Sequence, residues 1–316
     1  MSSAVRSEKV AEKIYRISDS IYRLGPLGEP RVLSSYLIID DKVSIVDCGP
    51  SAVVDELLTL ARQCGVRASD IDNLLLTHVH LDHAGGASLF LQKCPSAATY
   101  VPERGYKHML DPRALNASSK SVLGEIIFNY WKECGAVEKE RLCAVKPNEQ
   151  VWLGRTQVQY LPATGHAPHH NVIFDERDSC IFSADALGIF DETTGSLIPT
   201  TPPPSLDLPQ FLKDLDMIEG LRPKVACMAH YEEVSPSKEY FSSLRGVFEV
   251  WSEKARNYVA RKKSTSYSWS DYDELFKELE TAYPEYSKIS ASLREQALRV
   301  DVAGLVDYFA KQHKMS

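Results

Sequence analysis

A dense run of three imidazoles and a carboxylate follows a short apolar segment of the chain. The run Thr77-His78-Val79-His80-Leu81-Asp82-His83-Ala84-Gly85-Gly86 comes directly after Asp72–Leu76. That apolar segment is short and bounded by polar residues, so it predicts a buried strand. Side chains alternate along an extended backbone, so the first two histidines of the run are expected on one side of it. The aspartate and the third histidine then reach the same volume after the turn. These nitrogen and oxygen donors indicate a metal site at the end of a strand.

Further histidines and one aspartate also fall at predicted strand ends. Of the nine histidines, seven lie at or just past such an end. Besides the first run, these positions are His166, His169, His170 and His230, and Asp185 ends a predicted strand as well. The other two histidines lie in predicted helices: His108 and His313. Strand ends on one edge of a sandwich can converge, so we expect these donors to share one site.

Hydrophobic periodicity divides the chain into a β-rich part and a helical part. Strand-like alternation recurs from Ile14 to Val225–Ala229, with helical segments between. Beyond it, apolar residues recur at helical spacing from Tyr240 to Val300. We therefore predict a domain at residues 1–235 and a helical extension at 236–316. Residues 111–134 also have helical spacing, and the pattern leaves open whether this helix lies on the core or forms a lid over the site.

Composition bounds the possible partners. The chain has 316 residues, of which 44% are hydrophobic, enough to bury a sizeable core. The net charge of −7 argues against nucleic acid as a partner, because phosphate backbones are bound by basic surfaces. No stretch is long enough to cross a membrane, and the amino terminus lacks the apolar segment of a secretory signal. The seven cysteines are scattered and odd in number, so we expect a reducing cytoplasm.

Five segments, in order, resemble the motifs of the metallo-β-lactamase superfamily. They are the His78–His83 run, His166 after Gly165, Asp185 in Ser-Ala-Asp, His230 in Ala-His-Tyr, and Asp47 in Val-Asp-Cys-Gly. The resemblance covers about two thirds of the chain. It implies an α+β fold, a four-layer αββα sandwich, here with an all-α C-terminal extension.

The resemblance also implies a dinuclear metal site. One ion would be held by His78, His80 and His166. The other would be held by Asp82, His83 and His230, with Asp185 bridging both. The expected cofactors are two divalent metal ions, with Zn first and Fe or Mn as alternatives. Such ions lower the pKa of a shared water, and the resulting hydroxide attacks an electrophilic carbon or phosphorus.

Residues around the ligands receive supporting roles. Asp47 and His170 are expected to hold the ligands in place without binding metal themselves. His169 stands where related hydrolases usually carry glycine, and its role stays open. Asp82 is also the candidate for orienting the nucleophile or passing on its proton. Tyr231 follows a ligand directly, so its hydroxyl is a candidate for an oxyanion site, with a packed tyrosine as the alternative.

The first functional hypothesis is a metal-dependent hydrolase of a small-molecule ester, lactone, thioester or phosphoester. Apolar side chains at Ile189, Phe190 and in the helix with Phe128, Tyr130 and Trp131 favour an acyl or lactone substrate over a phosphate. A glyoxalase II-like thioesterase is not adopted, because Ala-His-Tyr-Glu at residues 229–232 differs from the His-Glu-Tyr order of that branch.

Two hypotheses of other classes remain. One is a diiron redox protein related to the flavodiiron core. In that branch, however, glutamate replaces the second histidine of the run, which is His80 here. The other is a catalytically idle binding protein whose extension binds a partner. Under all three hypotheses we expect the extension to cover the cleft or to pair subunits into a homo-oligomer, most simply a homodimer.

Overall fold

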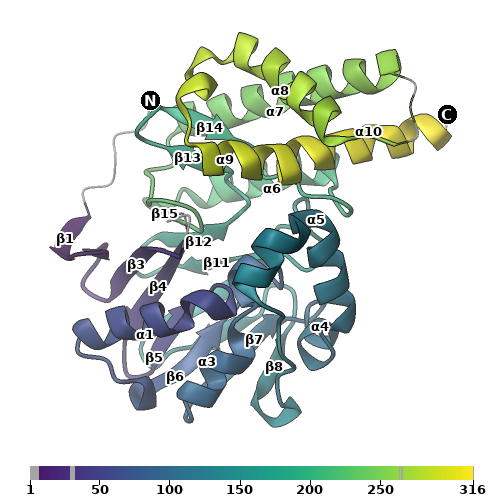
Figure 1. The fold of residues 1–316 in the computed structure, drawn as a ribbon. Coiled ribbons are helices and arrows are strands. Elements are labelled where there is room, and N and C mark those ends of the chain that lie inside the picture. Colours follow the sequence, from purple (N-terminus) through teal and green to yellow (C-terminus); the bar gives the residue numbers. More distant parts are fainter. Residues whose placement is uncertain (1–6, 29–32, 263, 265, 316) are drawn as a thin grey trace.

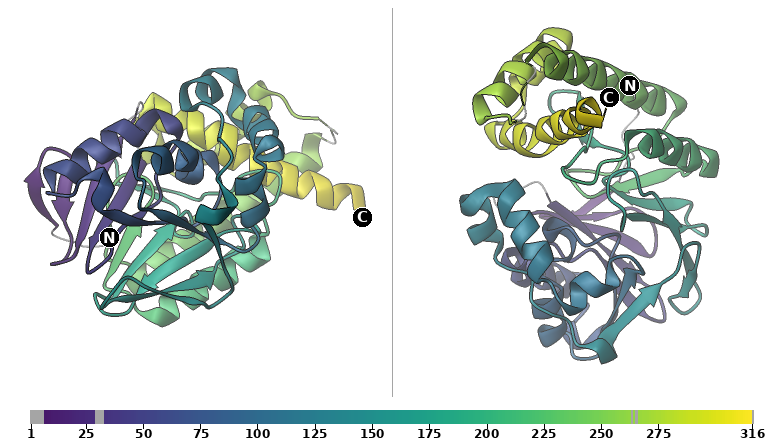
Figure 2. Two further views of the ribbon diagram at one scale, coloured as in Figure 1. Left: turned by 90° about the horizontal axis from the view of Figure 1, so that it is seen from below. Right: turned by 90° about the vertical axis from the view of Figure 1, so that its right-hand side faces the viewer.

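The computed structural model describes residues 7–28, 33–262, 264 and 266–315 (Figure 1). Two sheets stack face to face between layers of helices, which confirms the predicted αββα sandwich. The helical C-terminal region forms a separate slab along one side of the sandwich, as Figure 2 shows in its right-hand view. No helix among the described residues is long and apolar enough to cross a membrane.

The first sheet has eight strands in sequence order. They are β1 (Glu8–Ala11), β2 (Ile14–Arg16), β3 (Ile21–Leu27), β4 (Leu33–Ile39), β5 (Val43–Val46), β6 (Ile71–Leu75), β7 (Ala98–Pro102) and β8 (Leu142–Val145). β1 to β5 pair antiparallel, whereas β5 to β8 pair parallel. Parallel strands need a crossover connection, and helices supply it between β5 and β7. These crossovers bring the carboxyl ends of β5 and β6, which precede Asp47 and His78, to one edge.

The second sheet has five strands in the order β15 (Val225–Met228), β12 (Cys180–Ala184), β11 (Asn171–Asp175), β10 (Gln157–Pro162) and β9 (Gln150–Trp152). β12 and β15 are parallel, and the other neighbours are antiparallel. The ends of β10, β12 and β15 and the start of β11 therefore share one edge. A separate hairpin joins β13 (Ile189–Asp191) to β14 (Ser196–Ile198).

Helices cover the outer faces of both sheets. Those before residue 236 are α1 (Val54–Gln63), α2 (Leu81–Ala84), α3 (Ala87–Lys93), α4 (Tyr106–Leu110), α5 (Arg113–Trp131) and α6 (Leu208–Leu221), with the short turns η1 (Ser51–Val53), η2 (Ala68–Asp70) and η3 (Lys139–Arg141). The buried faces of α1 and α3 pack on the first sheet. A middle core of residues such as Tyr36, Leu75, Tyr160 and Phe182 fills the space between the sheets.

The C-terminal region is entirely helical among its described residues. It contains α7 (Lys238–Lys262), α8 (Trp269–Ala282), η4 (Pro284–Lys288), α9 (Ala291–Gln296), the π-helical turn η5 (Ala297–Val302) and α10 (Ala303–Met315). The predicted apolar stripe on α7, from Tyr240 to Tyr258, is buried. One continuous core joins these helices to the second sheet and α6. The boundary between residues 235 and 236 stays a prediction, since this core crosses it.

Two local features differ from the sequence expectation. Leu197 belongs to β14 and not to a loop, because Ser196–Ile198 pairs with Ile189–Asp191 across a short turn. The helix expected within residues 111–134 is α5, and it is broken at Gly124, whose φ of 76° lies outside the helical region. Only glycine adopts such a conformation without strain, so α5 changes direction there.

Candidate metal centre

The predicted ligands all lie at one edge of the sandwich. His78 and His80 follow β6, and α2 carries Asp82 and His83 immediately afterwards. The remaining three follow strands of the second sheet: His166 lies between β10 and β11, Asp185 follows β12, and His230 follows β15. The topology of the two sheets therefore brings together residues that are far apart in the sequence.

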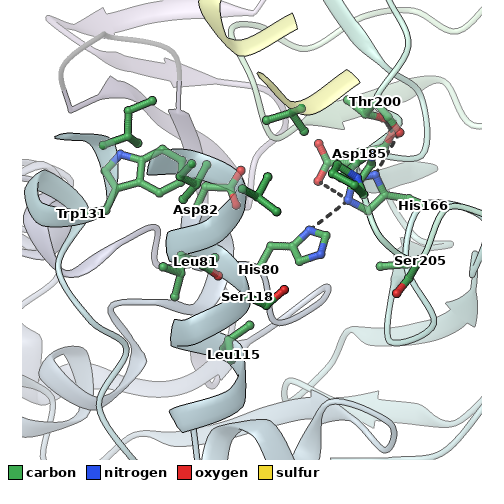
Figure 3. A pocket seen from close by; sticks show the side chains of 18 of the residues that line it. His80, Leu81, Asp82, Leu115, Ser118, Trp131, His166, Asp185, Thr200 and Ser205 are labelled. Atoms are coloured by element: carbon green, nitrogen blue, oxygen red, sulfur yellow. Dashed lines mark hydrogen bonds and ion pairs between the residues drawn. The ribbon is translucent and has the colours of Figure 1, made fainter. Parts of the chain in front are cut away.

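The first ligand group consists of three imidazoles. The Nδ1 atom of His80 lies 3.0 Å from Nε2 of His78 and 3.1 Å from Nε2 of His166. Figure 3 shows His80 pointing toward His166 at the wall of a pocket. Three nitrogens converging within this distance match the donor set of a metal ion of the zinc type.

The second group combines a carboxylate with two imidazoles. Oδ2 of Asp82 lies 3.5 Å from Nε2 of His83 and 3.7 Å from Nε2 of His230. Asp185 lies between the two groups. Its Oδ2 atom is 2.9 Å from Nε2 of His83 and 3.4 Å from Nε2 of His78, and its Oδ1 atom is 3.4 Å from Nε2 of His230. This carboxylate is therefore placed to touch an ion in either group.

The protonation chemistry of these residues fits two divalent cations. Burial lowers the pKa of His78, and it lowers that of His80 to about 3, so both rings are neutral at neutral pH. Burial opposes ionisation of Asp82, but the neighbouring His83 outweighs it and the pKa falls to about 2. Nε2 of His83 is buried in ion-pair contact with Asp185 at 2.9 Å, but it has no hydrogen bond of acceptable geometry in the described part of the chain. Buried, unpartnered ring nitrogens beside ionised carboxylates are what a metal ion would satisfy.

His83 shows the same fit from the opposite direction. Burial lowers its pKa, but the carboxylates of Asp82, Asp185 and Asp47 outweigh burial and raise the pKa well above the ordinary value. Without metal this ring is therefore in its cationic form, with both nitrogens protonated, among the three carboxylates. A cation would displace that proton, because a metal ligand must be the neutral imidazole.

Asp47 holds His83 from behind. Its Oδ2 atom accepts hydrogen bonds from Nδ1 of His83 at 2.8 Å and from Oγ1 of Thr77 at 2.7 Å, and its Oδ1 atom accepts from the Thr77 N–H at 2.9 Å. The backbone of Asp47 has a φ of 52°, in the left-handed region. The bond from Nδ1 leaves Nε2 of His83 free to face the ligands, so Asp47 fixes both the orientation and the tautomer of this ring.

We expect the substitution Asp47→Ala to weaken metal binding at the second group by about 10- to 100-fold. The loss follows because His83 would no longer be held with Nε2 toward the site. Competition with a chromophoric chelator measures the affinity. Asp70→Ala is the matched control, since Asp70 is paired with Arg67 on the surface. An unchanged affinity in Asp47→Ala would show that His83 needs no such support.

Other ligands are also supported by hydrogen bonds. Nδ1 of His166 donates to the carbonyl of Thr200 at 3.1 Å, which turns its Nε2 toward the site. The Thr200 hydroxyl donates to the carbonyl of Asp185. Nε2 of His170 accepts from the backbone N–H of Asp185 at 3.3 Å, so His170 lies behind the bridging residue. Thr200 was not identified from the sequence, because nothing in a proline-rich segment marks one threonine as a ligand support.

A cavity of about 590 Å³ opens beside the ligands. Among the ligands, His80, Asp82, His166, Asp185 and His230 line it. Much of the opposite wall comes from α5, as the positions of Leu115, Ser118 and Trp131 in Figure 3 show. The C-terminal helices contribute a third side: Ser292, Glu295, Val300 and Asp301. The helix at residues 111–134 thus lines the site, and the helical extension lies over it.

Some candidate residues lie away from the cavity. Ile189 and Phe190 pack with the core of the second sheet and do not line the cavity in the described chain, and Phe128 is buried in the first-sheet core. The side chain of Tyr231 packs between two cores and hydrogen-bonds with Ser290. An oxyanion role for Tyr231 stays a prediction, and the packed alternative has the contacts described.

His169 lies in the cavity wall together with a histidine that the sequence did not connect to the site. The ring of His169 is centred 5.2 Å from that of His80 and 6.0 Å from that of His108. His108 comes from α4, and Arg104 lines the cavity close by. Helical periodicity placed His108 in a helix correctly, but no spacing rule relates it to His169.

The sequence model of the metallo-beta-lactamase superfamily matches residues 28–230. This match covers more than half of the chain and includes every proposed ligand. The chain therefore belongs to the metallo-β-lactamase superfamily, as the resemblance of its motifs indicates.

Relatives and solved structures agree with this assignment. The metallo-beta-lactamase fold-containing protein ST1585 of Sulfurisphaera tokodaii is 29% identical over 67% of this chain and 77% of its own. Its crystal structure aligns with a TM-score of 0.60, at 26% identity, over 72% of this chain and 84% of that one. The probable metallo-hydrolase YybB of Bacillus subtilis is 24% identical, over 64% of this chain and 82% of its own.

Two further matches bear on the extension and on the chemistry. The metallo-beta-lactamase family protein TTHA1429 of Thermus thermophilus has a TM-score of 0.67 at 17% identity, over 94% of this chain and 95% of its own. Its fold therefore resembles this one beyond the sandwich. A nitric oxide reductase of Moorella thermoacetica is 25% identical over 49% of this chain, but the chain spans only 33% of that protein.

Proposed function

We propose that the protein is a dinuclear metal-dependent hydrolase of esters, lactones or thioesters with an apolar acyl group. The observation that carries the proposal is the placement of seven donors in two groups joined by Asp185, five of which line a largely apolar cavity. Zinc is the expected metal, because imidazole nitrogens and carboxylate oxygens are its usual ligands, with iron or manganese as alternatives.

When bound, the two ions supply a hydroxide near neutral pH and polarise the oxygen of the substrate. The residues of this chain supply position and charge. Asp185 keeps the two ligand groups in a fixed relation, because it faces both. Among the proposed ligands that form His–Asp ion pairs, Asp82 has the most exposed side chain, at 19%, and it lines the cavity. It is therefore the group we propose to orient the attacking oxygen and to accept its proton.

The cavity wall favours an uncharged acyl substrate over a phosphoester. Leu115, Val122, Leu123 and Ile127 of α5 form an apolar wall opposite the ligands. Among the described lining residues, Arg104 is the one with a permanent positive charge, and none is lysine. A phosphodiester would gain little from this wall beyond what the two metal ions supply, whereas an alkyl chain would gain free energy from burial along it.

Activity on a substrate panel tests the proposal. The protein would be loaded with zinc, manganese or iron and assayed on p-nitrophenyl esters of increasing chain length, alkyl lactones, glutathione thioesters and a phosphodiester. We expect kcat/KM for the octanoyl ester to exceed that for the acetyl ester by at least about tenfold, since each buried methylene contributes roughly 0.8 kcal/mol. Preference for the phosphodiester, or no hydrolysis by any metal form, would contradict the proposal.

A variant of α5 connects that preference to the cavity. Leu123→Trp adds bulk to a cavity-lining position, so we expect it to lower kcat/KM for the octanoyl ester about tenfold while leaving the acetyl ester within about twofold. Glu125→Ala is the control, because Glu125 is exposed on the same helix and does not line the cavity. Equal losses on both esters would mean that the chain does not lie along α5.

A diiron redox protein is the second candidate, favoured by the similarity to the nitric oxide reductase of Moorella thermoacetica. Against it stand the short part of that protein that this chain spans, and an imidazole at His80 in the first ligand group. Reduced, iron-loaded protein would consume dioxygen or nitric oxide if this candidate were correct. Consumption without ester hydrolysis would replace the hydrolase proposal.

A further inference from the structure

The C-terminal helices grip the loop that carries Thr200 and Thr201. Oδ1 of Asp301, in η5, accepts a hydrogen bond from the Thr201 N–H at 2.8 Å, and the Thr201 hydroxyl donates to the Asp301 carbonyl at 2.8 Å. One helical turn later, Gly304 touches the same loop. A β-carbon on Gly304 would lie 1.7 Å from the Thr201 carbonyl oxygen, so only glycine fits there. Asp301 and Gly304, on one helical turn, thus both contact Thr201. We call these contacts the clamp.

The residue next to this clamp holds two metal ligands. The carbonyl of Thr200 accepts the Nδ1–H of His166, and the Thr200 hydroxyl donates to the carbonyl of Asp185. His166 belongs to the first ligand group and Asp185 faces both. The Thr200 carbonyl and the Thr201 N–H belong to one peptide group, so Asp301 and His166 bond the two ends of the same peptide, and the Thr200 side chain adds the contact with Asp185.

We propose that Asp301 is a positioning residue of the metal centre, which makes the helical C-terminal region part of that centre and more than a cover over it. The inference rests on the proposed metal centre but not on the reaction. Asp301 accepts the N–H of the peptide group between Thr200 and Thr201 and so holds the plane of that peptide. The carbonyl of the same peptide accepts from His166 and holds the orientation of its ring. Loss of the clamp lets the ring turn, and the affinity for metal falls.

Asp301 both accepts the Thr201 N–H and fills buried space, and two substitutions separate these two roles. The side chain is 1% exposed, and its Oδ2 atom has no hydrogen-bond partner in the described part of the chain. Burial raises the pKa of this carboxyl well above its usual value, which favours the protonated form. Asn has the same shape and keeps an oxygen that accepts the Thr201 N–H. Leu has a similar size and accepts nothing.

The test compares Asp301→Asn and Asp301→Leu with a control in the same helical region. Tyr258→Phe is suitable, because the Tyr258 hydroxyl bonds only Asp271 and Glu274 among the hydrogen bonds described, both within that region. Zinc affinity would be measured by chelator competition, the visible spectrum by loading with cobalt(II), and unfolding on the metal-free protein. None of these readouts depends on a substrate.

We expect Asp301→Leu to weaken zinc binding about 3- to 30-fold and to change the cobalt spectrum. Asp301→Asn should stay within about twofold of the parent, and Tyr258→Phe should alter only the unfolding of the metal-free protein. If Asp301→Leu does not fold, Asp301→Ala decides, since it also removes the Oδ1 acceptor of the Thr201 N–H and adds no bulk. Unchanged affinity and spectrum in whichever of these two variants folds would overturn the proposal. A parent protein that binds zinc but hydrolyses nothing would refute the hydrolase and not this contact.

Discussion

Asp185→Asn is expected to leave the fold intact and to lower kcat/KM by about 10³-fold or more, with loss of at least one bound metal ion per chain. The reason is charge and geometry together. Oδ2 of Asp185 lies within 3.6 Å of Nε2 of His78, His83 and His166. An amide cannot supply negative charge between two cations. The Asn side chain would also present one neutral oxygen and one NH₂ group in place of two charged oxygens, so only one of its atoms could be a metal ligand.

Metal content after dialysis and kinetics on the preferred ester measure the two effects. Asp175→Asn is the matched control, because Asp175 is a fully buried carboxyl on the same sheet, at the far end of β11 from the ligands. Burial raises its pKa, so an amide is a close substitute there. If Asp185→Asn retained both ions and its activity, the bridging role of Asp185 would have to be abandoned.

The sequence was sufficient to predict that the proposed ligands converge, because their positions follow a rule of the fold. Each ligand follows a strand, and strands of the αββα sandwich end at a common edge, so residues from His78 to His230 converge without any knowledge of side-chain contacts. The αββα layers were predicted from the resemblance of the five motifs to the metallo-β-lactamase superfamily. Strand alternation and helical spacing predicted only which segments are strands and which are helices.

What the sequence did not reveal depends on contacts between distant segments. Thr200, Asp301 and Gly304 act through hydrogen bonds with backbone or ring atoms and through close approach, and none of them has a periodicity or a characteristic spacing. His108 faces the site because α4 packs next to the loop of His169. Predicting such contacts requires the packing of whole elements, because the residue types involved are common in any loop or helix.

Gly165 is a further position where close approach, and not chemistry, determines the residue. It precedes the ligand His166 and lies against the first turn of α6. A β-carbon there would come within 2.2 Å of the Phe211 Cα atom and 2.3 Å of its nitrogen. The Gly165 N–H donates to Oδ2 of Asp214 at 2.7 Å, and its carbonyl accepts from the Asp207 N–H at 2.9 Å. The backbone N–H and carbonyl of Gly165 are thus both bonded to α6 or its N-cap residue, which holds the loop with His166 against the helix.

We therefore expect Gly165→Ala to destabilise the protein by about 1–3 kcal/mol or more, because backbone must move to admit the methyl group. The melting temperature should fall by about 2 to 4 °C for each kcal/mol, and zinc affinity should fall as well, since His166 moves with the loop. Gly220→Ala is the control: Gly220 lies in α6 with nothing near its added β-carbon, and alanine favours a helix by up to about 1 kcal/mol. A Gly165→Ala protein as stable as Gly220→Ala, with unchanged zinc affinity, would mean that α6 yields to the methyl group and that His166 is not positioned through this contact.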